Sequence, residues 1–162
     1  MASSTQILVL QLTNRRARQY FNYNNGNEKI SFMYDSGARI PIWCSGEDLL
    51  KKAFPDAVQQ NMKCMVSGFG EGAEEGAVYM IPEFRLESDS AVFIIRSLYI
   101  VALNKPSIGC DFILSETMFM KSDTYTYRRD KRELHIVFDQ SEFHCTPIRQ
   151  SGYIDEVTVW SQ

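Results

Sequence analysis

The segment "ISFMYDSGARIPI", residues 30–42, decides the fold because an apolar, strand-like run ends there on a carboxylate. Asp35 follows the run and precedes Ser36 and Gly37, which are residue types typical of turns. Burying a carboxylate at the end of a strand is costly unless another group holds it or a reaction uses it. Asp35 is therefore interpreted either as a turn former or as a catalytic group.

The composition is that of a globular protein. The chain has 162 residues, of which 44% are hydrophobic and 23% are charged. This balance predicts a single domain over residues 1–162, with its core at about 7–138 and a C-terminal extension at 140–162. The formal net charge is −3 and the basic residues are scattered, so neither nucleic acid nor a membrane is an expected partner.

The N-terminus and the cysteines favour a cytoplasmic protein. The apolar run at 7–12 is too short for the hydrophobic part of a signal peptide, and no stretch approaches the length needed to span a bilayer. The four cysteines are widely spaced without a CxxC pair, so they are interpreted as reduced thiols. His144 and Cys145, with His135 as the one other histidine, are too few to supply the four ligands of a zinc site. We therefore expect no metal and no cofactor.

Short apolar or alternating segments predict a β-rich domain. The predicted strands cover residues 7–12, 30–34, 40–43, 62–66, 77–81, 92–95, 98–103 and 134–138, with a further candidate at 157–160. Turn signals separate them in "NYNNGNE", "GEGAEEG" and "ALNKPS". In the segment at 134–138, Leu134, Ile136 and Phe138 are expected to face the core.

Two segments are predicted to be short helices. "SGEDLLKKAF" begins with Ser45 as a possible N-cap and is expected to place Leu49, Leu50 and Phe54 on one side. "DFILSETMF", residues 111–119, begins with Asp111 at a cap position and is predicted to form about two helical turns.

Three motifs occur in a fixed order along this chain. "YDSGA" covers residues 34–38, the glycine-rich "SGFGEGAEEG" covers 67–76 between two predicted strands, and "SIGCDFI" covers 107–113 at the start of the second predicted helix. Together they resemble the motifs of the retropepsin-like aspartic proteases over about residues 7–138. The resemblance implies a closed β-barrel of the acid protease type with two short helices and a flap hairpin.

The resemblance also implies an activity, which is peptide hydrolysis by an aspartic endopeptidase. Asp35 would be the catalytic residue. Peptide hydrolysis without a metal or a covalent intermediate requires one carboxylate to deprotonate a water while a second, protonated one donates to the scissile carbonyl. Gly37 allows a tight turn beneath the carboxylate, Ser36 would brace the pair by a hydrogen bond, and Ala38 completes the supporting motif.

The number of motifs predicts the assembly. A two-lobed aspartic protease would carry two Asp-Ser/Thr-Gly motifs, and this chain carries one. The second carboxylate must then come from another copy across a two-fold axis, which predicts an obligate homodimer that acts on a peptide or protein substrate. Asp111 is the alternative partner within the chain, but a cap or structural role is favoured for it.

The glycine-rich stretch is interpreted as the flap and not as a dinucleotide loop. A G-x-G-x-x-G pattern would place its third glycine on Glu75, and the three glutamates of this stretch would repel phosphate. The predicted substrate-binding residues of the flap are Gly68, Phe69, Gly70 and Gly72, which would offer backbone groups to an extended peptide.

Two other interpretations stay open at this point. A catalytically silent dimeric module of the same fold would bind peptides without cleaving them, and Tyr34 and the acidic flap are compatible with it. An unrelated β-barrel that binds a ligand would use Asp35 as a turn residue.

Overall fold

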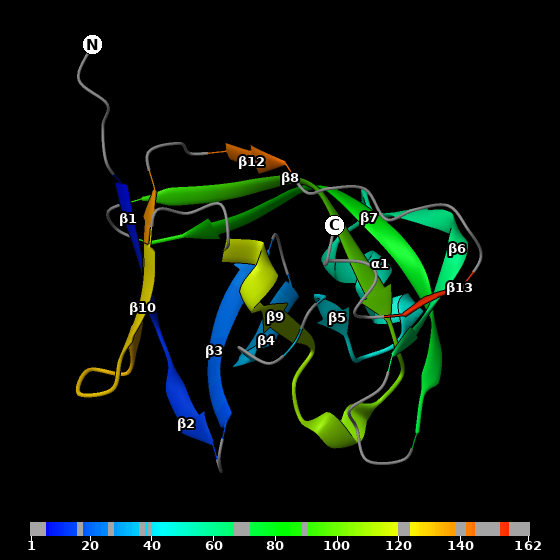
Figure 1. Ribbon diagram of the computed structural model, residues 1–162, viewed down its shortest axis with the longest axis horizontal. Helices are drawn as coiled ribbons and strands as arrows, with labels where there is room; N and C mark the ends of the chain where they lie inside the picture. Colours follow the sequence, from blue (N-terminus) through cyan, green and yellow to red (C-terminus); the bar gives the residue numbers. More distant parts are fainter. Residues whose placement is uncertain are drawn as a thin grey trace.

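The computed structural model describes residues 6–15, 18–25, 28–35, 38, 40–66, 72–88, 91–119, 124–138, 142–144 and 153–155. Strands dominate these residues (Figure 1). In chain order the elements are β1 (Gln6–Gln11), β2 (Thr13–Arg15), β3 (Arg18–Asn25), β4 (Glu28–Asp35), β5 (Ile42–Trp43), α1 (Glu47–Ala53), β6 (Val58–Val66), β7 (Glu74–Glu87), β8 (Val92–Ala102), η1 (Pro106–Ile108), β9 (Phe112–Ser115), η2 (Glu116–Phe119), β10 (Thr124–Arg128), β11 (Glu133–Phe138), β12 (Glu142–His144) and β13 (Tyr153–Asp155).

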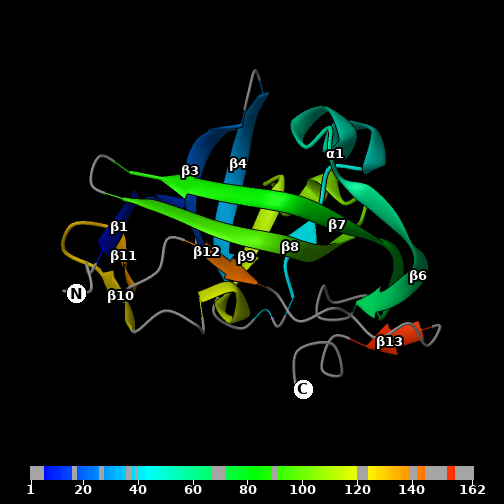
Figure 2. The ribbon, with the colours of Figure 1, turned by 90° about the horizontal axis from the view of Figure 1, so that it is seen from above.

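The strands form two sheets. The smaller sheet has the order β1-β11-β10, and the larger has the order β13-β6-β7-β8-β5-β9-β4-β3-β2, with β12 beside β8. The long hairpin of β7 and β8 spans the molecule, with the smaller sheet at one end and β6 at the other (Figures 1 and 2). The β-rich prediction is confirmed. The predicted closed barrel is not found, because β13 and β2 end the larger sheet without pairing with each other among the described residues.

Two apolar cores lie on opposite faces of the central strands. Successive residues of a strand point to opposite faces, and β4 accordingly sends Phe32 into the larger core and Met33 into the smaller one. The larger core also contains Leu134, Ile136 and Phe138, which confirms the predicted inward set of β11. The smaller core joins the end of β4 to β6, β8 and β9.

Aromatic rings fill the centre of the larger core. Phe112 of β9 is fully buried, and its ring centroid lies 5.4 to 6.3 Å from those of Phe32, Trp43, Phe54 and Phe84. Such offset and edge-to-face pairs add to the free energy gained by burial. These contacts fix β9 against β4, β5 and β7.

The first predicted helix exists, but its N-cap is not Ser45. The helix α1 begins after Gly46, and the Ser45 hydroxyl instead donates to Asp111 Oδ1 at 2.6 Å. Leu50 and Phe54 are buried as predicted, whereas Leu49 is 47% exposed. The apolar face of this short helix is therefore narrower than the sequence suggested.

The second predicted helix, over residues 111–119, is wrong. Residues 112–115 form the strand β9, which pairs in parallel with β4 and antiparallel with β5, and a 3-10 turn, η2, follows. Asp111 does not cap a helix. Its carboxylate accepts hydrogen bonds from the Ser31 backbone N–H at 2.9 Å and from Ser45, so it ties β4 to the start of α1.

Candidate active site

Asp35 is the last residue of β4, where two neighbouring strands support it. The strand pairs with β3 up to Tyr34, and on the other side Asp35 itself is in register with Ser115 of β9. The side chain is half-buried. Strand alternation places it on the face of Met33, above the smaller core. The carboxylate thus stands at the end of a strand that is fixed from both sides.

The chain turns directly after Asp35. The backbone N–H of Ala38 donates to the Asp35 carbonyl at 3.1 Å, and Ala38 is buried in the smaller core. Such a bond between residues i and i+3 defines a tight turn. The predicted bracing residues Ser36 and Gly37 lie outside the described residues.

Ser115 is a residue that the sequence analysis missed. It is in register with Asp35 on the parallel neighbour β9, so the two side chains share a face of the sheet. Ser115 is fully buried, and among the described positions it is the one buried residue that is polar. The signal that could have found it is the continuous apolar run before it, which is typical of a buried parallel strand.

Tyr34 packs against the larger core. Its ring centroid lies 6.2 Å from that of Phe119, and the side chain is half-buried. An aromatic ring just before Asp35 thus contributes to the packing that holds the end of β4.

The predicted flap has a hairpin stem. The strands β6 and β7 pair antiparallel up to Val66 and Glu74, so residues 67–73 connect them. Gly72 is exposed with a φ of 88°, a left-handed conformation that favours glycine. Gly68, Phe69 and Gly70 lie outside the described residues. Residues 74–76, which we placed in the glycine-rich stretch, belong to β7.

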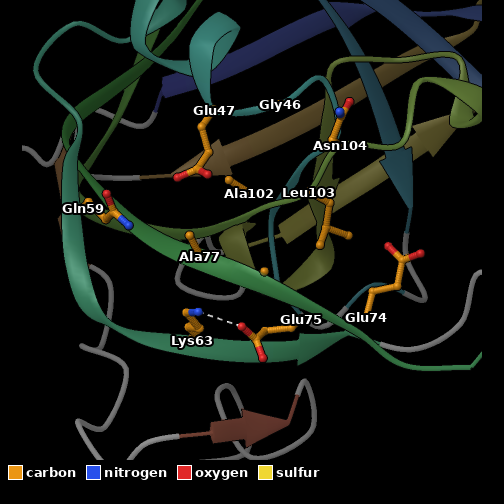
Figure 3. Close-up of a pocket in the computed structure, with 11 residues that line it drawn as sticks. Gly46, Glu47, Gln59, Lys63, Glu74, Glu75, Ala77, Ala102, Leu103 and Asn104 are labelled. Atoms are coloured by element: carbon orange, nitrogen blue, oxygen red, sulfur yellow. Dashed lines mark ion pairs between the residues drawn. The ribbon is translucent and has the colours of Figure 1, made fainter.

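A polar cavity of about 360 Å³ lies beside the stem of this hairpin (Figure 3). Its lining comes from the start of α1, from β6 and β7, and from the end of β8. Lys63 of β6 forms a 2.8 Å ion pair with Glu75 of β7 at one side of the cavity, and Lys105 forms another of the same length with Glu74. Asp35 does not line this cavity.

Close packing explains why one residue that lines the cavity, Gly76, is a glycine. A Cβ at Gly76 would collide with Val101 and would lie 2.9 Å from the Ala102 carbonyl oxygen. Position 76 therefore requires a glycine, because β7 lies very close to β8 there. The register of β6 and β7 shifts between Gln59 and Lys63, two residues that also line the cavity.

Tyr79 links the hairpin to α1. Its side chain is 1% exposed, and its hydroxyl donates to Glu47 Oε1 at 2.5 Å. Burial, together with the hydrogen bond to Glu47 and the negative charges of Glu47 and Asp48, raises the pKa of Tyr79 from 10.0 to about 12. The neutral phenol is therefore the form that the folded state prefers.

We expect this pKa shift to make stability depend on alkaline pH. Because the folded pKa lies above the unfolded one, the stabilisation is fully present below pH 10 and is lost as the pH rises toward 12. The difference in unfolding free energy between wild type and Tyr79→Phe should be constant up to about pH 9 and about 1 kcal/mol smaller at pH 11. Urea denaturation of both proteins at each pH measures it. If the difference in unfolding free energy between the two proteins is the same at pH 8 and at pH 11, the raised pKa of Tyr79 is contradicted.

The described residues give no sign of a metal centre or of a membrane helix. They contain no group of three or more His, Cys, Asp or Glu side chains that could hold a metal ion. In the same part of the chain, no helix is long and apolar enough to cross a bilayer.

Comparisons with known proteins define the fold. No protein-family model matches the chain, and no curated protein matches it by sequence. Among solved structures, it is similar to a retropepsin-like aspartic protease from Rickettsia conorii, with a TM-score of 0.53 and 18% sequence identity over 83% of this chain and 94% of the other. The chain thus has a fold similar to that of a retropepsin-like aspartic protease, as the order of its motifs predicted.

Proposed function

We propose that the protein is an aspartic endopeptidase in which Asp35 of each of two subunits forms the catalytic pair. The observation that carries the proposal is the position of Asp35. It is the half-buried end of β4, it lies beside β9, and a tight turn follows it in a chain of retropepsin-like fold.

The chemistry follows from two carboxylates held close together. Because two negative charges held close together repel each other, the proposed mechanism uses one ionised and one protonated carboxyl group. The ionised group takes a proton from water while the protonated one donates to the scissile carbonyl. Ser36 and Gly37 are proposed to support the pair, and residues 68–72 to cover the bound peptide.

The homodimer is part of the proposal because the sequence carries one Asp-Ser-Gly motif. A site on the two-fold axis takes one carboxylate from each subunit. We also propose a cytoplasmic location, because the four cysteines of the sequence are widely spaced and contain no CxxC pair.

Dilution tests the dimeric site. If the site is shared between subunits, specific activity on a mixed-sequence peptide library should fall as the protein is diluted through its dimer dissociation constant. Sedimentation at the same concentrations gives the fraction of dimer as the control. Constant specific activity at concentrations where only monomer sediments would contradict a shared site.

A further inference from the structure

The outer edge of β6 is occupied by a segment of the same chain. β6 pairs with β7 along one edge. Along the other edge it pairs in parallel with β13, in the register Tyr153 with Lys63, Ile154 with Cys64 and Asp155 with Met65. Figure 2 shows β13 beside β6 at the end of the long hairpin. Without β13, this edge would present unpaired backbone groups, which readily bind another extended strand.

The occupied edge lies next to the proposed flap. Residues 63–65 immediately precede Val66, the last residue of β6 before the connection at 67–73. Cys64 and Val66 are buried in the smaller core together with Met33, whose face of β4 also carries Asp35. The strand β6 therefore contributes to the same apolar core as Met33 of β4.

The segment on this edge forms few backbone pairs with the sheet. β13 has three residues and ends the larger sheet, so among the described strands β6 alone is its backbone partner. By comparison, β7 and β8 pair from Ala77 to Glu87. Short terminal strands with few backbone hydrogen bonds open at low free-energy cost. We therefore expect the occupant of the β6 edge to exchange while the rest of the sheet stays intact.

We propose that the outer edge of β6 is a docking site for an extended peptide that runs parallel to β6, and that Tyr153–Asp155 occupies it as an internal competitor. An incoming peptide substrate would displace this segment and take over its backbone hydrogen bonds. The inference rests on the proposed function for the identity of that peptide, but the exchange of the segment can be measured without catalysis.

Proline substitutions in the full chain test the exchange. Ile154→Pro and Asp155→Pro each remove a backbone N–H, and because successive N–H groups of a strand point to opposite sides, one of the two removes an N–H that faces β6. At least one variant should raise amide hydrogen exchange of residues 63–65 by about tenfold, with no change at residues 78–81 inside the sheet. Ile154→Val, which keeps the N–H, is the matched control and should exchange like wild type.

Adding the segment back tests the docking site directly. A synthetic peptide of residues 150–160, "QSGYIDEVTVW", should restore slow exchange at 63–65 in the proline variant, whereas a scrambled peptide should not. Equal exchange of residues 63–65 in wild type and both proline variants would overturn the proposal. Failure of the synthetic peptide to restore protection would overturn it as well.

A statine-type peptide, which mimics the tetrahedral intermediate of peptide hydrolysis, separates this proposal from the proposed function. The proline variant that frees the edge should bind it about tenfold more tightly than wild type, because no internal segment has to be displaced. If wild type and variant bind the statine-type peptide with equal affinity, then Tyr153–Asp155 does not compete with peptides for the β6 edge. The protease assignment would stay intact in that case. If the tail peptide docks but no form of the protein binds the statine-type peptide, the docking site stands and the protease assignment fails.

Discussion

Replacement of Asp35 by Asn is expected to reduce peptide hydrolysis by about three orders of magnitude while the chain still folds and dimerises. Asparagine keeps the size of the side chain but cannot take a proton from water. Because two carboxylates held together repel each other, the variant dimer should also be more stable by about 1–3 kcal/mol. Cleavage of a peptide library between about pH 4 and 7 and thermal melting of both proteins measure the two effects.

Asp56→Asn is the matched control, since Asp56 is exposed in the turn after α1. It should change neither activity nor melting temperature. Cleavage by Asp35→Asn at the wild-type rate would show that the reaction uses other groups. Absence of cleavage by either protein, together with a higher melting temperature of the variant dimer, would favour the catalytically silent peptide-binding module.

Replacement of Phe112 by Ala is expected to lower the free energy of unfolding by about 3–5 kcal/mol. The ring is fully buried among four other aromatic rings, so truncation leaves a cavity that these neighbours cannot fill. Urea denaturation measures the loss. Phe112→Leu, which fills most of the space, should lose less, and Val58→Ala, at a side chain 51% exposed, should lose little. A loss below about 1 kcal/mol for Phe112→Ala would contradict the packing described for β9.

The error at β9 shows where sequence patterns fail. A buried parallel strand is apolar on both faces, and a short run of this kind cannot be distinguished from a buried helix by periodicity. Asp111 also favoured the incorrect helix prediction, because an acidic residue before an apolar run is typical of a helix start. Its hydrogen bonds go instead to Ser31 and Ser45, which lie far away in sequence.

Local signals predicted β4 and its end at Asp35, because the apolar run and the turn residues are neighbours in sequence. The stem formed by β6 and β7 was predicted for the same reason. The pairings of β12 with β8 and of β13 with β6 were not, since they join distant segments whose short strands carry no strong pattern. The candidate strand at 157–160 lies outside the described residues. The register of Asp35 with Ser115 likewise depends on the tertiary fold.

Mixing wild type with Asp35→Asn tests most directly whether one site needs Asp35 from two chains. After the subunits exchange randomly, only dimers with two wild-type subunits hold both carboxylates. Activity per total protein should therefore fall with the square of the wild-type fraction, to about one quarter in an equal mixture. A linear fall, to about one half in the same mixture, would show that each chain acts alone and would contradict the shared catalytic pair.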